Sequence, residues 1–226
     1  MISALLIDLD DTLYDERTYV LSGFSAVAQE LARRHPRLDA AALAAGMEAE
    51  LDTHGRGRIF DVVLQAAGLP ASPALIGELV GVYRDHRPAI SLWPGVADTL
   101  TTLAKSYRLA IVTDGLALMQ SRKIEALGVA DLVDEVLLCW GAAAPKPDPA
   151  CYLEALRRMG AFPAQAVVIG DNPGHDMAAA AAVGCRSVRV RTGKFAALGD
   201  NGFPADAEAP SFVQIAPVLA RLEPGG

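Results

Sequence analysis

The stretch ALLIDLDDTL, residues 4–13, joins a short apolar run to three closely spaced aspartates. Because residues 4–7 are apolar and bounded by polar residues, they predict a buried β-strand. Packing alone rarely gathers carboxylates at a strand end, since they repel one another and resist burial unless they are paired or bound to metal. Two interpretations therefore stand on this stretch alone. It is either an acidic surface turn or a site where Mg²⁺ binds and one aspartate acts as a nucleophile.

Length and composition narrow the class of protein. The chain has 226 residues, which suits one large core or a core with a small insert. A formal net charge of -7 and the lack of a basic block argue against a nucleic-acid-binding surface. No apolar run is long enough to cross a bilayer, and the N-terminal run is too short for a signal sequence. We therefore expect a cytoplasmic protein without nucleic-acid or membrane partners.

The three cysteines, Cys139, Cys151 and Cys185, are odd in number and irregularly spaced. They form no CxxC pair, which argues against a structural zinc site. Cys139 and Cys185 lie in or beside apolar segments, so we expect both to be small core residues.

Hydrophobic periodicity divides the chain into two kinds of region. Between residues 18 and 87 it predicts only helices, at 18–34, 40–51, 59–67 and 73–83. Asp39 is a plausible N-cap for the second of these. After the turn signal at residues 93–95, short apolar runs at 109–112, 136–139, 167–169 and 187–190 predict strands. Between and after them we expect helices at 116–127, 149–159, 177–183 and 215–222, with a loop at 192–210.

Strands that alternate with helices indicate a parallel sheet covered on both faces. We therefore predict an α/β fold, a doubly wound parallel sheet with a small all-helical domain inserted after the first strand. The predicted core comprises residues 1–14 and 91–226, and the insert comprises residues 15–90.

Polar residues follow each central strand of the predicted sheet. They are Asp8, then Thr113-Asp114-Gly115, then Lys146, and finally Asp171-Asn172 with Asp176 five residues beyond Asp171. In doubly wound sheets, ligands bind beyond the carboxyl ends of the strands. These endings would surround one crevice with a hydroxyl, an ammonium and several carboxylates, a set that can bind Mg²⁺ and a phosphate together.

With these four motifs in this order, the chain resembles the haloacid dehalogenase-like (HAD) hydrolase superfamily. The resemblance covers nearly the whole core, and Asp-Leu-Asp-Asp-Thr-Leu at 8–13 is a specific form of the first motif. The helical insert is similar to the cap domain of the helical-cap phosphatase branch.

The resemblance implies that Asp8 attacks a phosphoryl group to form an aspartyl-phosphate, while Asp10 protonates the leaving oxygen and then activates water. Asp8, the backbone carbonyl of Asp10, and Asp171 would hold Mg²⁺. Thr113 would bind phosphoryl oxygens, and Lys146 would neutralise charge on Asp8 and the phosphate.

Asp176, Asp114, Gly115 and Asn172 would support these groups, with Asp176 orienting Lys146 or the metal shell. Read locally, Thr113 could instead be a helix N-cap, Lys146 a solvated loop residue and Asp176 a surface acid. We expect Asp114 to point away from the phosphate or toward the cap.

The expected activity is Mg²⁺-dependent hydrolysis of a small phosphorylated metabolite by a monomer or homodimer. Candidates for contact with the leaving group are Tyr14, Arg17, His54, Arg56 and Arg58, and the Arg56–Arg58 loop would suit an anionic substrate. Alternatives are a phosphoglucomutase-like phosphotransferase, a non-catalytic scaffold, or a 2-haloacid dehalogenase. Dehalogenases of this superfamily attack carbon and need neither Mg²⁺ nor the second catalytic aspartate.

Overall fold

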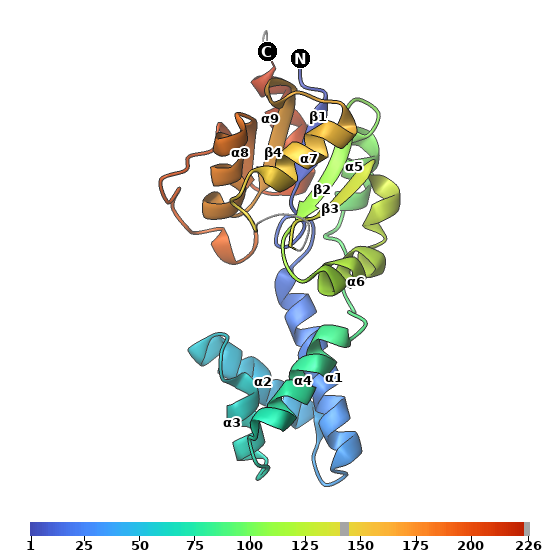
Figure 1. Cartoon of the computed structure of the whole chain (residues 1–226), viewed down its shortest axis with the longest axis vertical. Coiled ribbons are helices and arrows are strands. Elements are labelled where there is room, and N and C mark those ends of the chain that lie inside the picture. The colour runs from blue at the N-terminus through green and yellow to red at the C-terminus, as the bar shows by residue number, and fades with distance from the viewer. Residues whose placement is uncertain (141–144, 224–226) are drawn as a thin grey trace. The chain divides into compact units, whose positions relative to one another are not determined.

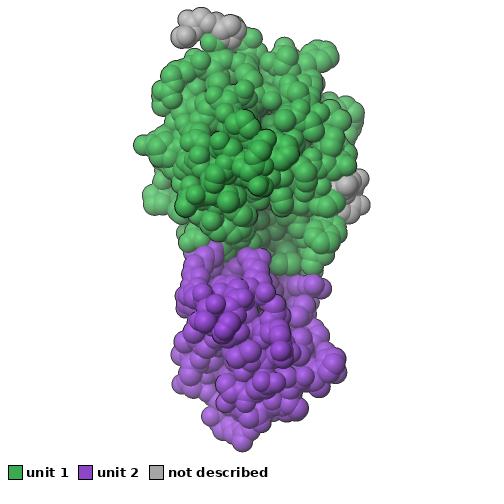
Figure 2. All heavy atoms as spheres, turned by 90° about the vertical axis from the view of Figure 1, so that its left-hand side faces the viewer, with its two compact units in different colours: residues 1–16, 91–226 green, residues 17–90 purple. Residues whose placement is uncertain are grey.

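The computed structural model describes residues 1–140 and 145–223. The chain divides into two compact units (Figure 2), one formed by Met1–Glu16 with Ser91–Gly226 and the other by Arg17–Ile90. The first boundary lies two residues later than the sequence predicts. Residues 224–226, at the end of the predicted core, lie outside the described residues.

The first unit is built on a parallel sheet of six strands in the order β3-β2-β1-β4-β5-β6. The strands are β1 (Ala4–Ile7), β2 (Arg108–Thr113), β3 (Glu135–Leu138), β4 (Ala166–Gly170), β5 (Arg186–Val190) and β6 (Ala207–Ala209). β1 lies between β2 and β4, where Ile7 pairs with Ile111 and Ile169. A strand buried on both faces needs an unbroken apolar run, which explains why residues 4–7 show no polar alternation.

Helices cover both faces of this sheet (Figure 1). They are α5 (Val96–Leu103), α6 (Ala117–Leu127), α7 (Ala150–Met159), α8 (Ala178–Val183) and α9 (Ile215–Leu222). Tyr152 of α7 and Ala180 of α8 pack with Leu6 and Val168 in one apolar cluster on one face. α5 and α9 lie on the opposite face. The predicted doubly wound α/β fold is confirmed.

Three elements differ from the sequence prediction. α5 was not predicted, although Val96, Leu100 and Leu103 are buried at helical spacing. Its β-branched threonines weaken the helical pattern. The predicted loop at 192–210 contains β6, a three-residue edge strand too short to show periodicity. The helix predicted from 177 is preceded by a π-helical turn, Pro173–Met177. Short 3₁₀ turns lie at Val129–Leu132, Pro163–Gln165, Gly193–Phe195 and Phe212–Gln214.

The second unit contains the four predicted helices. They are α1 (Glu16–Arg34), which begins two residues earlier than predicted, α2 (Ala40–His54), α3 (Ile59–Ala66) and α4 (Pro73–Asp85). Asp39 caps α2 as predicted, because its side chain accepts a hydrogen bond of 2.8 Å from the Ala42 amide. The unit has its own apolar cluster, which includes Leu31, Met47 and Leu64. Across the described residues, no helix combines the length and apolar character that a membrane crossing requires.

The cysteines correct one expectation. Cys139 and Cys185 are buried as predicted, but Cys139 forms a disulfide with Cys151, twelve residues later in α7. Cys185 is free, and burial raises its pKa to about 11, so its thiolate is disfavoured. Disulfides are rare in reducing compartments, so this bond stands in tension with the expected cytoplasmic location. Cysteine spacing alone does not predict this pairing, because the two sulfurs meet only once α7 packs on the sheet.

Reduction of this disulfide should lower stability. Closing a loop of 12 residues removes unfolded-state entropy worth about 3 kcal/mol. We expect urea unfolding of the oxidised protein to give a free energy higher by about that amount than unfolding with dithiothreitol. A Cys151→Ser variant should be insensitive to reductant, whereas Cys185→Ser should keep the wild-type response. Identical unfolding curves for the wild type with and without reductant would contradict the bond.

Candidate active site

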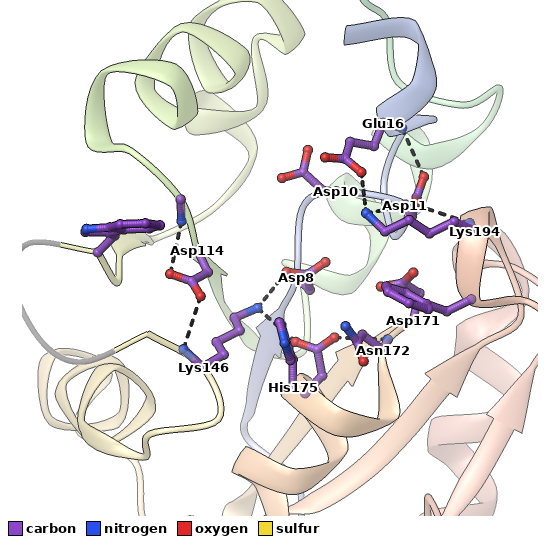
Figure 3. Close-up of a pocket in the computed structure, with 14 residues that line it drawn as sticks. Asp8, Asp10, Asp11, Glu16, Asp114, Lys146, Asp171, Asn172, His175 and Lys194 are labelled. Carbon is purple, nitrogen blue, oxygen red and sulfur yellow. Dashed lines mark hydrogen bonds and ion pairs between the residues drawn. The ribbon is translucent and has the colours of Figure 1, made fainter. Parts of the chain in front are cut away.

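The functional residues gather at the carboxyl ends of β1 and β4, where the strand order reverses direction. Asp8 follows β1, Asp171 follows β4, and Lys146 reaches the same edge from the segment before α7 (Figure 3). Predicted residues that line the common pocket are Asp8, Asp10, Asp114, Gly115, Lys146, Asp171, Asn172 and Asp176. Asp11, Trp140, His175 and Lys194 line it as well.

Lys146 lies at the centre of the pocket. Its Nζ is 2.6 Å from Asp8 Oδ1 and 2.8 Å from Asp176 Oδ1, and its side chain is only 2% exposed. The interpretation of Lys146 as a solvated loop residue is therefore wrong. Burial alone would lower the pKa of Lys146, but the carboxylates of Asp176 and Asp8 raise it well above its usual value. A fixed positive charge thus stands beside Asp8.

Three carboxylates crowd around this single cation. Oxygen atoms of Asp8, Asp171 and Asp176 lie within 4.8 Å of one another. Burial, with the other two carboxylates, raises the pKa of Asp171 to about 9. Burial raises the pKa of Asp8 to about 7, although Lys146 opposes the shift. In the described part of the chain, Oδ2 of Asp171 is buried without a hydrogen-bond partner. When all three carboxylates are ionised, they and the Lys146 ammonium carry two net negative charges, a charge that a bound divalent cation would balance.

Asp176 has both carboxylate oxygens engaged by protein groups. Oδ1 accepts hydrogen bonds from Lys146 and from the Tyr152 hydroxyl at 3.0 Å. Oδ2 accepts a hydrogen bond from the backbone amide of Asn172 at 3.2 Å. A Cβ at Gly170 would lie 2.3 Å from Asp176 Oδ2, so only glycine leaves room for this carboxylate. The surface-acid interpretation of Asp176 is wrong, because its side chain is 2% exposed. Asp176 therefore forms a buried ion pair with Lys146.

The Asp10 carboxylate is held by the core and by α6. Its Oδ1 lies 2.7 Å from Lys123 Nζ, its Oδ2 accepts from Gln120 Nε2 at 2.9 Å, and the Tyr14 hydroxyl also donates to it. Burial raises the pKa of Asp10, but Lys123 and the hydrogen bonds outweigh it, so the net pKa is lowered. Sequence reasoning missed Lys123 and Gln120. The sequence feature that could have identified them is their position: both polar residues lie on the face of α6 that also carries the buried Ile124.

Thr113 is the last residue of β2, and its hydroxyl accepts a hydrogen bond from Gln120 Nε2. It is not a helix N-cap, since Leu116 occupies the cap position of α6. Asp114 accepts from the amide of Gly115 at 3.0 Å and from the amide of Lys146 at 3.2 Å. Asp114 therefore fixes the backbone that carries Lys146.

Asp11 joins the first loop to the segment after β5. Its carboxylate accepts from the Glu16 amide at 3.0 Å and from the Lys194 amide at 3.3 Å. Gly193 has φ 63°, and a Cβ there would lie 2.2 Å from the Asp11 side chain. The close approach explains a glycine at this position. The hydrogen bonds of Asp11 thus reach a segment that lies 183 residues away in the sequence.

Arg189 of β5 is a third residue that sequence reasoning missed. It is fully buried, and its guanidinium donates to the backbone carbonyls of Asp171 at 3.1 Å, Leu198 at 2.8 Å and Phe195 at 2.7 Å. In β5, RSVRV, the polar Ser187 and Arg189 alternate with valines, a pattern typical of a strand with one exposed face. In the structure one arginine instead fixes the backbone of Asp171 against the segment after β5.

Two residues that were predicted to contact the leaving group, Tyr14 and Arg17, bind other side chains of the protein. Tyr14 is fully buried in the first unit, where its hydroxyl donates to Asp10. Arg17 belongs to the helical unit and forms ion pairs with Glu48 at 2.8 Å and Asp52 at 2.6 Å.

The other three predicted contacts also lie in the helical unit. His54 ends α2 with its Nδ1 3.1 Å from a Glu50 oxygen. Arg58 is 75% exposed at its side chain and lies 3.8 Å from Asp61. Arg56 lines a largely apolar pocket within that unit, together with Phe24, Phe60 and Tyr83.

Several known proteins are similar to this chain in sequence or in fold. It is 32% identical to a glyceraldehyde 3-phosphate phosphatase from Methanopyrus kandleri over 212 residues, 86% of each chain. It is 31% identical to a phosphoserine phosphatase from Thermus thermophilus over 61% of this chain and 55% of that one. A solved 2-haloacid dehalogenase from Pseudomonas syringae pv. Tomato DC3000 is 31% identical with a TM-score of 0.69, covering 99% of this chain and 100% of the other.

A solved HAD phosphatase from Thermococcus onnurineus is 25% identical with a TM-score of 0.62, covering 96% of this chain and 98% of the other. The family model for haloacid dehalogenase-like hydrolases matches residues 2–184. This match spans β1, β2, β3 and β4 and every residue of the acidic pocket up to Asp176. The chain is a member of the haloacid dehalogenase-like hydrolase family.

Proposed function

We propose that this protein is a Mg²⁺-dependent phosphatase that hydrolyses a small phosphorylated metabolite through an aspartyl-phosphate on Asp8. The observation that carries the proposal is the pairing of Asp8 with Lys146 at 2.6 Å beside the buried oxygen of Asp171. Phosphoryl transfer requires a nucleophilic carboxylate, a fixed ammonium and a divalent-cation site that lie together, here at one edge of the sheet.

The chemistry has two balanced halves. An Asp8 carboxylate oxygen attacks phosphorus, the bond from phosphorus to the leaving oxygen breaks, and that oxygen takes a proton from Asp10. Water then attacks the phosphorus of the aspartyl-phosphate, its proton passes to Asp10, and the bond to Asp8 breaks to release phosphate. Because Lys123 lowers the pKa of Asp10, this carboxyl must bind a proton before the first half begins, and the second half restores that proton. Throughout both halves, Lys146 holds positive charge against Asp8 and the transferring group.

Asp8, the backbone carbonyl of Asp10, and Asp171 would hold the Mg²⁺ ion. When bound, the ion neutralises charge on the phosphoryl oxygens and on the crowded carboxylates. Asp176 would orient Lys146 rather than bind the ion, since its oxygens already accept hydrogen bonds from Lys146, Tyr152 and the backbone amide of Asn172. Thr113 would donate its hydroxyl hydrogen to a phosphoryl oxygen while its oxygen still accepts the hydrogen bond from Gln120.

Two relatives are named for phosphate esters of three-carbon compounds, glyceraldehyde 3-phosphate and phosphoserine. We propose a substrate of that size class. The helical unit, Arg17–Ile90, would act as the cap that selects the leaving group. Arg56 and Arg58 supply positive charge in that unit for an acidic substrate.

Removal of metal should abolish turnover. We expect phosphate release from glyceraldehyde 3-phosphate, phosphoserine or p-nitrophenyl phosphate in Mg²⁺, and a fall of at least about 100-fold in EDTA. The reason is that three carboxylates beside Lys146 repel a phosphate unless a cation offsets them. Re-addition of Mg²⁺ should restore the rate, which is the control for irreversible damage. Undiminished turnover in EDTA would refute the metal-dependent mechanism.

The second candidate is a 2-haloacid dehalogenase, favoured by the 31% identity to the Pseudomonas syringae structure. In that chemistry Asp8 attacks carbon and expels halide. The crowding of Asp171 and Asp176 beside Asp8 favours the phosphatase, because a metal-free site gains nothing from the extra charge. Chloride release from 2-chloropropionate in EDTA, without phosphatase activity in Mg²⁺, would establish the dehalogenase.

A further inference from the structure

Two side chains of α6 reach the Asp10 carboxylate from outside the four sequence motifs. Gln120 and Lys123 lie three residues apart, so they share one face of the helix. Both are buried, with exposed fractions of 2% and 3%. Lys123 lies 2.7 Å and 2.9 Å from the two oxygens of Asp10, which is a bidentate contact. We define Gln120 and Lys123 as the α6 clamp.

The clamp occupies positions where apolar side chains would ordinarily lie. Lysine is almost never fully buried unless it is paired. Replacing a buried ion pair by apolar groups of similar size is often neutral or stabilising. The stability of the fold therefore does not by itself explain the buried pair of Lys123 and Asp10. What an ion pair does supply is a fixed position for the carboxylate, because both oxygens are held at once.

The clamp also joins two strand ends. Gln120 Nε2 donates to Asp10 Oδ2 at 2.9 Å and also to the Thr113 hydroxyl. Asp10 follows β1 and Thr113 ends β2, and these strands are neighbours in the sheet. One amide therefore sets the spacing between the proposed acid–base group and the proposed phosphoryl-binding hydroxyl. Small displacements of such groups cost rate steeply.

We infer that Gln120 and Lys123 are positioning residues that hold the Asp10 carboxylate in its acid–base position. The inference rests on the proposed function and adds two residues from outside the motifs to that site. Lys123 is not one of the residues that line the pocket, so it would act through Asp10. Its loss lets the carboxylate rotate away, which should affect catalysis more than substrate binding.

A double-mutant cycle separates positioning from a structural role. For Lys123→Met we expect kcat to fall about 10- to 100-fold with KM changed less than about threefold. In an Asp10→Asn background, the same substitution should change kcat less than about threefold, because the group it positions is already lost. Lys123→Arg should recover part of the rate. Lys105→Met, at an exposed lysine of the same unit, is the matched control.

Each outcome decides the inference. Unchanged kcat in Lys123→Met, or full additivity with Asp10→Asn, would overturn it, because a merely structural lysine acts independently of Asp10. Thermal unfolding of every variant, with rates taken at least about 15 °C below its midpoint, keeps misfolding from imitating a catalytic loss. A folded wild type without turnover on any phosphate ester would instead overturn the proposed function and this inference with it.

Discussion

Replacement of Asp8 by asparagine is expected to lower kcat by about four orders of magnitude or more, because the carboxylate oxygen that attacks phosphorus is lost. The amide is nearly isosteric, so the fold should persist. Asp8 already sits beside Lys146 at 2.6 Å, and the variant removes one negative charge from the cluster. Steady-state phosphate release and mass spectrometry of the acid-quenched protein would measure the effect, with a gain of one phosphoryl group in the wild type only.

Asp98→Asn is the matched control, since Asp98 is an exposed aspartate in the same unit. It should leave kcat within about twofold of the wild type. Full phosphatase activity in Asp8→Asn would exclude nucleophilic catalysis by this residue. A phosphoryl group found on another residue would relocate the intermediate.

Replacement of Lys146 by methionine is expected to lower kcat about 10²- to 10³-fold and to destabilise the fold by about 3–5 kcal/mol. The two losses share one cause. Lys146 is the buried cation between Asp8 and Asp176, and methionine leaves both carboxylates uncompensated. Urea unfolding and steady-state kinetics measure the two effects separately.

Mg²⁺ provides an internal check on this interpretation. The variant should gain more stability from added Mg²⁺ than the wild type does, because the ion then offsets charge that Lys146 no longer offsets. Lys146→Arg keeps the charge and serves as the conservative comparison. Equal stability of Lys146→Met and the wild type would show that the buried ion pair contributes nothing to the fold.

The sheet and most helices could be predicted because their signals are local. Residues 4–7 are apolar throughout since β1 is covered on both faces, and Asp39 caps α2 through its own short side chain. The rule that ligands bind beyond the carboxyl ends of the strands then predicts that Asp8, Lys146 and Asp171 share one edge of the sheet. β6 was missed because three residues carry no measurable period.

What the sequence could not predict depends on contacts between distant segments. Lys123 lies 113 residues from Asp10, and its place on the same helix face as Ile124 does not reveal which group it contacts. Arg189 looks equally exposed, but it turns inward to the carbonyl of Asp171. Both become recognisable only when a polar side chain is found on a buried face. Such residues are the usual failures of pattern reasoning because tertiary contacts override local preference.

The central place of β1 also dictates an order of events during synthesis. β1 leaves the ribosome first, yet its neighbours are residues 108–113 on one side and 166–170 on the other. At roughly 5–20 residues per second, the second neighbour emerges about 10–30 s after the first strand. The helical unit, continuous in sequence from Arg17 to Ile90, is complete long before then. In a nascent chain, the helical unit is therefore fully synthesised while β1 still lacks both of the strands with which it pairs.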